Sequence, residues 1–198
     1  EDYVEVAEIL GNKLDMFELN ISCPNVKEGG MAFGTDAKMI EEITSKVKAV
    51  SKVPLIVKLS PNVTDIAEMA KAAEAGGADA ISLINTLLGM KIDINTRRPV
   101  LNNNMGGMSG PAVMPVAVRM VYQVRRAVKL PIIGMGGITT GEDAVEFLLA
   151  GADAVSVGTA GIVDPYAWIK VRNEINDYLD KNGYESVNDI VGKLEMNN

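Results

Sequence analysis

The single cysteine of the sequence, Cys23, lies in the segment NISCPN, residues 20–25. An apolar run precedes this segment, and proline, asparagine and glycines follow, which is typical of a loop at the end of a strand. The sequence contains no histidine, so a thiol here would act as a lone base or nucleophile. An unperturbed thiol titrates at about 8.5, so we expect such an activity to rise with pH. The alternative is a buried structural cysteine.

Two glycine-rich motifs follow later apolar runs: GMGGI at residues 134–138 and VGTAG at residues 157–161. Glycines let backbone N–H groups approach an anion closely, and the start of a helix adds partial positive charge. In (β/α)8 barrels the loops after the last two strands often bind phosphate. Together the motifs predict a phosphate site, although each alone is compatible with a tight turn. The spacings of a P-loop and of a dinucleotide fingerprint are both absent.

Polar side chains also occur at the ends of two central apolar runs. Lys58 lies in LIVKLS, residues 55–60, where a buried ammonium needs a negative partner or must be neutral. We expect it to point inward at the catalytic end of a sheet, and a lysine that reaches solvent from a strand end is the alternative. Asn85 and Thr86 follow another run, and their neutral hydrogen-bonding groups suit a polar planar ligand or an ordinary polar loop.

The composition is typical of a globular protein, with 47% apolar and 23% charged residues. This excludes a disordered chain, a collagen-like chain and a small disulfide scaffold. The net charge of −7 argues against nucleic-acid binding, because a phosphate backbone requires a basic surface. No apolar run approaches the roughly 18 residues that a membrane span needs. One cysteine forms no internal disulfide and holds no iron–sulfur cluster alone, so we expect a reducing, cytoplasmic location and no metal site.

The apolar runs alternate with segments of helical periodicity, which indicates βα units. The five runs are continuous, as expected for parallel strands covered on both faces, and comprise residues 16–21, 55–59, 80–84, 131–135 and 154–157. The predicted helices are residues 36–50, 64–75, 111–128, 141–150, 165–179 and 186–194. Thr35 is the expected N-cap of the first helix. Residues 87–110 have no helical period, and we expect a hairpin with strands at 91–94 and 99–101.

An internal repeat favours a barrel. GADAIS at residues 77–82 recurs as GADAVS at residues 151–156, each downstream of a similar strand, KVPLI or KLPII. Repeated βαβα blocks predict a (β/α)8 TIM barrel rather than an open doubly wound sheet, although two convergent turns are the alternative. Eight βα units take about 250 residues. Since only five strands are predicted, we expect one domain, residues 1–198, with about the last five βα units of a barrel.

With these residues in view, the chain resembles the class 1 dihydroorotate dehydrogenases. The motifs that carry the resemblance occur in one order: NISCPN (20–25), VKLSP (57–61), INT (84–86), SGP (109–111), GMGG (134–137) and VGT (157–159). The segment NVKEGG followed by FGTD resembles subclass B, the catalytic subunit of the NAD-linked bacterial enzyme. The motifs are specific in combination and span residues 18–159.

The resemblance implies an FMN-bearing barrel that oxidises (S)-dihydroorotate to orotate in pyrimidine (UMP) biosynthesis. It implies that Cys23 removes the C5 proton while the C6 hydride passes to FMN, with Lys58 beside the flavin pyrimidine ring. Asn20, Asn85 and Thr86 would contact the substrate, and Asn20 would also lie near the flavin. The remaining FMN-binding residues would be Ile84, Gly110, Gly136, Gly137, Gly158 and Thr159.

The resemblance also implies a partner. In subclass B, electrons pass to a second subunit that carries FAD and a [2Fe–2S] cluster and reduces NAD+, and we expect a homodimer or heterotetramer. The family has a further upstream stretch of about three βα units, with part of the FMN site, so we expect this chain to be the C-terminal portion of a subunit. Two alternatives stay open: the related flavin domain of dihydropyrimidine dehydrogenases, and a non-catalytic, phosphate-binding barrel fragment.

Overall fold

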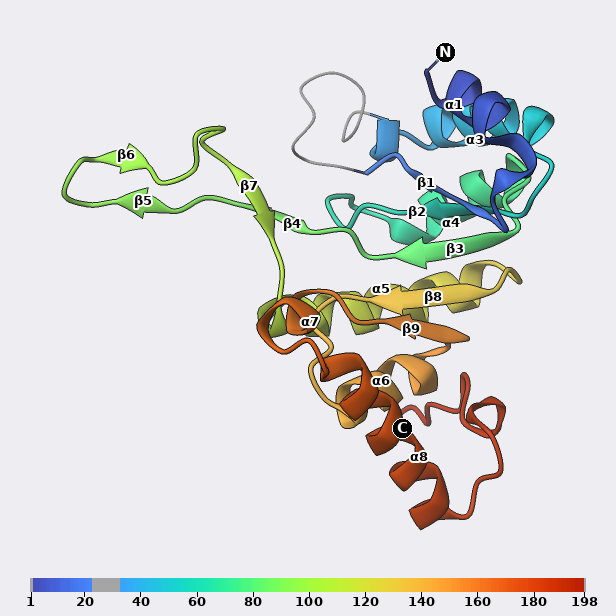
Figure 1. The fold of residues 1–198 in the computed structure, drawn as a ribbon, viewed down its shortest axis with the longest axis vertical. Coiled ribbons are helices and arrows are strands. Elements are labelled where there is room, and N and C mark those ends of the chain that lie inside the picture. The colour runs from blue at the N-terminus through green and yellow to red at the C-terminus, as the bar shows by residue number, and fades with distance from the viewer. Residues whose placement is uncertain (1, 23–32, 198) are drawn as a thin grey trace.

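A five-stranded parallel sheet forms the centre of the computed structural model, which describes residues 2–22 and 33–197 (Figure 1). The strands lie in the order β1-β2-β3-β8-β9, which is also their order along the chain. Their bounds are β1 Phe17–Asn20, β2 Leu55–Lys58, β3 Ala80–Leu83, β8 Ile132–Met135 and β9 Ala154–Ser156. Each strand lies within one of the five predicted apolar runs, so the strand predictions are confirmed.

Helices alternate with these strands, as predicted. Their bounds are α1 Asp2–Leu10, α3 Ala37–Val50, α4 Ile66–Ala75, α5 Met114–Ala127, α6 Gly141–Ala150, α7 Thr159–Val163 and α8 Ala167–Asn182. Short 3-10 turns occupy Gly11–Lys13, Pro111–Val113 and Val187–Asp189. Within the described ranges, no helix combines the length and apolar character that a membrane crossing requires.

The face of the sheet that packs on helices is apolar. It carries the row Leu19, Val57, Ile81 and Ile132, which are neighbours in register and at most 6% exposed. Crossovers between parallel strands are right-handed, so strands that follow chain order place their helices on one and the same face. The main hydrophobic core forms there, against α3, α4, α5 and α6.

The opposite face carries polar side chains. Asn20, Lys58 and Ser82 are neighbours in register across β1, β2 and β3, and Glu18 lies two residues before Asn20 on the same face. Glu18, Asn20 and Ser156 are exposed. The prediction that the strands are covered on both faces therefore holds for only one face among the described residues.

The repeated Gly-Ala-Asp turn joins each helix to the next strand by the same contacts. Asp79 accepts a hydrogen bond from the Leu55 backbone N–H at 2.7 Å and lies 2.5 Å from the Lys48 ammonium. Asp153 accepts the N–H of Ile132 at 2.8 Å and pairs with Arg125. Each carboxylate thus joins the start of the preceding strand to a cation on a helix. This shared contact explains why the Gly-Ala-Asp sequence occurs twice.

A ribbon of short strands projects from the sheet between β3 and α5 (Figure 1). Near the sheet, β4 Leu87–Gly89 pairs antiparallel with β7 Gly106–Met108. Farther out, β5 Ile92–Asp93 pairs antiparallel with β6 Arg98–Pro99. Asp93 closes the outer turn, because its carboxylate accepts the N–H of Asn95 at 2.9 Å. The predicted hairpin is confirmed, although its strands are shorter than expected and the second begins one residue earlier, at Arg98. The inner pair of β4 and β7 was not predicted.

Two helix predictions need correction, and two further helices were not predicted. The N-cap of α3 is Asp36, whose carboxylate accepts the N–H of Lys38 and Met39, and not Thr35. Residues 186–194 form only the 3-10 turn Val187–Asp189, because a capping box closes on Asp189 and the turn ends one residue later. The helices α1 and α7 were not predicted, since α7 is a five-residue segment of small and apolar side chains.

The pH dependence of the Asp79 contact follows from its surroundings. Burial acts to raise the pKa of Asp79, but hydrogen bonds from Lys48 and from the N–H of Leu55, with the charge of Lys48, outweigh it and leave the pKa below its ordinary value. A depressed folded-state pKa stabilises the fold above the carboxyl's unfolded pKa. That stabilisation is lost as the pH falls through the folded-state value.

We expect Asp79→Ala to lower the free energy of unfolding by about 1 to 2 kcal/mol at neutral pH, because the buried N–H of Leu55 loses its acceptor. Urea unfolding at neutral pH and at about pH 3 measures this difference, which should shrink at the lower pH. Glu42→Ala is the control, since it removes an exposed carboxylate that pairs with Lys46 on the surface of α3. An equal loss at both pH values would contradict the assignment.

Candidate functional site

The predicted site residues lie together at the carboxyl ends of the parallel strands. Asn20 ends β1 and Lys58 ends β2, and the two are partners in register. The other predicted residues follow strands: Ile84, Asn85 and Thr86 after β3, Gly110 after the ribbon, Gly136 and Gly137 after β8, Gly158 and Thr159 after β9. Cys23, the predicted base, lies outside the described residues.

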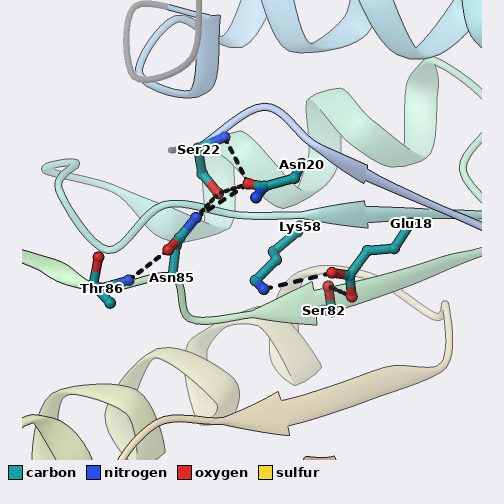
Figure 2. Close-up of polar contacts among 7 residues, drawn as sticks. All are labelled: Glu18, Asn20, Ser22, Lys58, Ser82, Asn85 and Thr86. Carbon is teal, nitrogen blue, oxygen red and sulfur yellow. Dashed lines mark hydrogen bonds and ion pairs between the residues drawn. The ribbon is translucent and has the colours of Figure 1, made fainter. Parts of the chain in front are cut away.

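Asn85 is the centre of a hydrogen-bond network that joins β1 to β3 (Figure 2). Its Nδ2 donates to Asn20 Oδ1 at 3.1 Å and to Ser22 Oγ at 2.8 Å. Its Oδ1 accepts the N–H of Thr86 at 2.8 Å. The Ser22 hydroxyl also donates to Asn20 Oδ1 at 3.1 Å, and Ser22 is fully buried. The two amides and the residue directly before Cys23 are therefore fixed relative to one another.

Asn62 fixes the backbone on the other side of Thr86. Its Nδ2 donates to the Thr86 carbonyl at 3.0 Å, while its Oδ1 accepts the N–H of Leu88 at 2.9 Å. Gly107 on β7 packs against the same threonine, because a Cβ there would lie only 2.1 Å from Thr86 Oγ1. The segment that presents Asn85 and Thr86 is thus held by the loop after β2 and by the ribbon.

Lys58 lies between this network and a carboxylate (Figure 2). Its Nζ is 3.5 Å from Glu18 Oε1, and the side chains are 21% and 38% exposed, respectively. The Ser82 hydroxyl donates to Glu18 Oε2 at 2.9 Å. Lys58 therefore points to the polar face of the sheet and has a negative partner, as the sequence predicted for an inward lysine.

A cavity of about 310 Å³ opens at the carboxyl ends of β2, β3, β8 and β9. This volume lies within the range of small-molecule sites. The predicted residues in its wall are Lys58, Ile84, Asn85, Thr86, Gly136, Gly137, Gly158 and Thr159. Gly110 instead lines a neighbouring cavity of about 330 Å³ that shares Gly137 and Thr159. The Thr159 hydroxyl donates to Ser109 Oγ at 2.9 Å and ties the loop after β9 to the ribbon.

The glycines of the two motifs have different surroundings. Gly137 has a φ of 88°, and a Cβ there would lie 2.8 Å from both the Gly110 carbonyl oxygen and Met114 Cβ. Its absence of a side chain is thus required by the turn and by packing. Among residues 2–22 and 33–197, no atom lies within 4 Å of the position that a Cβ on Gly158 would take. Gly158 therefore leaves open space at the cavity wall.

A capping box fixes the loop after β8. The Asp143 carboxylate accepts the N–H groups of Thr139 and Thr140 at 2.8 and 2.9 Å, and the Thr140 hydroxyl accepts the N–H of Asp143. Burial acts to raise the pKa of Asp143, but these hydrogen bonds outweigh it, so the pKa lies below its ordinary value. The loop that carries Gly136 and Gly137 is thereby joined to the start of α6.

Four residues of this arrangement were not among the predicted site residues: Glu18, Ser22, Asn62 and Ser82. A signal for one of them was present. Phe17, Glu18, Leu19 and Asn20 alternate between apolar and polar, which indicates a strand with one polar face. The prediction that the run 16–21 is continuous and covered on both faces is therefore wrong for Glu18 and Asn20, which are exposed. Asn62 has a local partner, since its N–H and Nδ2 donate to Ser60 Oγ two residues away. Its bonds to the Thr86 carbonyl and the Leu88 N–H span 24 and 26 residues, so no local pattern predicts them.

Comparisons with known proteins agree on one family. The family model described as dihydroorotate dehydrogenase matches residues 1–179. The catalytic subunit of dihydroorotate dehydrogenase B (NAD(+)) from Alkaliphilus oremlandii is 62% identical over 98% of this chain, and dihydroorotate dehydrogenase A (fumarate) from Lactobacillus helveticus is 55% identical over 100% of it. The chain spans 64% and 65% of the lengths of these relatives.

A solved structure has the same fold. The crystal structure of DHODH from Eimeria tenella in complex with ferulenol superposes with a TM-score of 0.82 at 25% sequence identity. The match covers 97% of this chain and 57% of that one. The parallel sheet described above is accordingly a partial (β/α)8 barrel, as the sequence predicted.

The open space beside Gly158 yields a prediction. We expect Gly158→Ala to weaken the binding of a phosphate-bearing ligand, with FMN as the probe, by about tenfold, because the methyl group obstructs close approach to the loop. The thermal unfolding midpoint should be unchanged, since the new Cβ meets no atom of the described part of the chain. Flavin fluorescence quenching and thermal unfolding provide the two measurements.

Gly137→Ala is the matched comparison, since both glycines line the cavity. It should lower the unfolding midpoint, because its Cβ would meet backbone and side-chain atoms at 2.8 Å. Unaltered FMN binding by Gly158→Ala would remove the loop after β9 from the ligand site.

Proposed function

The chain belongs to the dihydroorotate dehydrogenase family, and from this premise we propose that it carries the flavin and substrate residues of an enzyme that oxidises (S)-dihydroorotate to orotate. The reaction would belong to pyrimidine (UMP) biosynthesis. The observation that carries the proposal is the 310 Å³ cavity, whose wall combines one ammonium, two polar side chains after β3 and the glycine loops after β8 and β9.

The described residues are suited to FMN. The glycine loops after β8 and β9 offer backbone N–H groups where an anionic phosphate could approach, and Gly158 leaves room for it. Ile84 is 4% exposed and supplies an apolar wall, while Lys58 supplies a positive charge at the cavity wall. Apolar walls with a few placed polar groups are what a cofactor site requires. We therefore propose Lys58, Ile84, Gly110, Gly136, Gly137, Gly158 and Thr159 as FMN-binding residues, with Asn20 near the flavin.

In the proposed mechanism, FMN would supply the acceptor for the hydride that leaves C6 of dihydroorotate. Cys23, as thiolate, takes the proton from C5, so that the C5–C6 double bond of orotate forms. Asn20, Asn85 and Thr86 orient the substrate. Since Asn20 and Asn85 are joined to Ser22, the residue before Cys23, the same network would align the substrate with its base. Lys58 holds positive charge at the cavity wall, where negative charge would develop.

We also propose which molecule accepts the electrons from the reduced flavin. The name of the relative from Alkaliphilus oremlandii specifies NAD(+) and a catalytic subunit. We propose that a partner subunit with FAD and a [2Fe–2S] cluster carries electrons from this chain to NAD+. The relative named for fumarate is 55% identical, which makes fumarate the second acceptor to test.

Cys23→Ala should abolish flavin reduction by dihydroorotate, because a positioned base contributes about 10²- to 10⁴-fold. Cys23→Ser should retain slow reduction that requires higher pH, since a serine hydroxyl is a far weaker acid than a thiol. Anaerobic stopped-flow absorbance over a range of pH measures both. The flavin spectrum before mixing is the control for FMN binding, and near-normal reduction by Cys23→Ala would contradict the role of Cys23.

A further inference from the structure

Glu18 lies on the polar face of the sheet without a role in the proposed reaction. It belongs to β1, two residues before Asn20, and both of its carboxylate oxygens have partners. Oε2 accepts the Ser82 hydroxyl at 2.9 Å, and Oε1 lies 3.5 Å from Lys58 Nζ. Three adjacent strands thus contribute one residue each to a single chain of polar contacts (Figure 2).

The two partners of Glu18 differ in mobility. Ser82 is fully buried on the central strand β3, so its hydroxyl is a fixed anchor. Lys58 carries its charge on a flexible four-carbon stem, which has many rotamers unless something holds the ammonium. A carboxylate anchored by Ser82 and placed beside Nζ restricts those rotamers. Glu18 on β1 and Ser82 on β3 therefore orient the Lys58 side chain, in addition to the backbone of β2.

The same lysine lines the 310 Å³ cavity. We propose that Glu18, anchored by Ser82, is a positioning residue for Lys58: it holds the ammonium at the cavity wall where the flavin of the proposed function would lie. The inference rests on that proposed function. Glu18 is not among the described residues that line the cavity, and in this proposal it acts through Lys58.

Removal of Glu18 has two effects on the flavin midpoint potential, and they have opposite signs. Loss of a nearby negative charge would by itself favour reduction and raise the potential. Loss of a positioned ammonium would disfavour reduction and lower it. If Glu18 positions Lys58, then Glu18→Ala lowers the potential although a negative charge has been removed. Ser82→Ala changes no charge and should also lower it.

The experiment measures the midpoint potential of the FMN-loaded protein and the dissociation constant for FMN in five variants. They are Lys58→Met, Glu18→Ala, Glu18→Gln, Ser82→Ala and the double variant Lys58→Met with Glu18→Ala. Glu18→Ala and Ser82→Ala should each reduce the equilibrium constant for flavin reduction by about tenfold, which corresponds to about 1.4 kcal/mol. Glu18→Gln retains one oxygen that can accept from Lys58, while its NH2 group can donate to the Ser82 hydroxyl, so it should lie closer to wild type than Glu18→Ala. Glu42→Ala, which removes the carboxylate of an exposed Lys–Glu pair, is the control and should cause no change.

The results distinguish the positioning role of Glu18 from the placement of Lys58 beside the flavin. A lowered potential in Lys58→Met, with no further effect of Glu18→Ala in that background, supports the positioning role. An unchanged potential in Lys58→Met would overturn the placement of Lys58 beside the flavin. A lowered potential in Lys58→Met together with an unchanged or raised potential in Glu18→Ala would overturn the positioning role alone.

Discussion

The register of the parallel sheet is the constraint on which the site depends. Because side chains alternate across a strand, the same register that aligns Leu19 with Val57 under the helices aligns Asn20 with Lys58 on the other face. A slip of one residue would bury the lysine in the core and expose the valine. The apolar row thus fixes the polar row, and helix packing determines which side chains reach the cavity.

The register is in turn secured by contacts far from the cavity. Asp79 and Asp153 bind the first N–H groups of β2 and β8, at the amino ends of the strands, and pair with cations on α3 and α5. Glycine has a comparable role at Gly134, where a Cβ would lie 2.6 Å from Phe147. That glycine belongs to a motif predicted to approach an anion, but its surroundings show a strand–helix contact. Within one motif, Gly134 therefore permits strand–helix packing, while Gly136 and Gly137 line the cavity.

The strands and the site's location could be predicted because their signals are local. Short apolar runs, helical periods and the Gly-Ala-Asp repeat all lie within a few residues of the elements that they specify. The contacts that arrange the site are not local. Ser82 and Glu18 are 64 residues apart, and Asn85 and Ser22 are 63 residues apart. No sequence pattern within either segment therefore predicts these hydrogen bonds. The N-cap of α3 shows a smaller limit, since Thr35 and Asp36 are both good caps and only geometry selects the aspartate.

We propose that the polar face and the glycine loops together form a flavin site specific for dihydroorotate. Anaerobic titration of the FMN-loaded protein with (S)-dihydroorotate or dihydrouracil, followed by the flavin absorbance band, tests it most directly. Dihydrouracil lacks the carboxylate of dihydroorotate and is otherwise the same ring. The account predicts stoichiometric bleaching by dihydroorotate and none by dihydrouracil under the same conditions. Bleaching by dihydrouracil, or an oxidised flavin that persists with excess dihydroorotate, would contradict it.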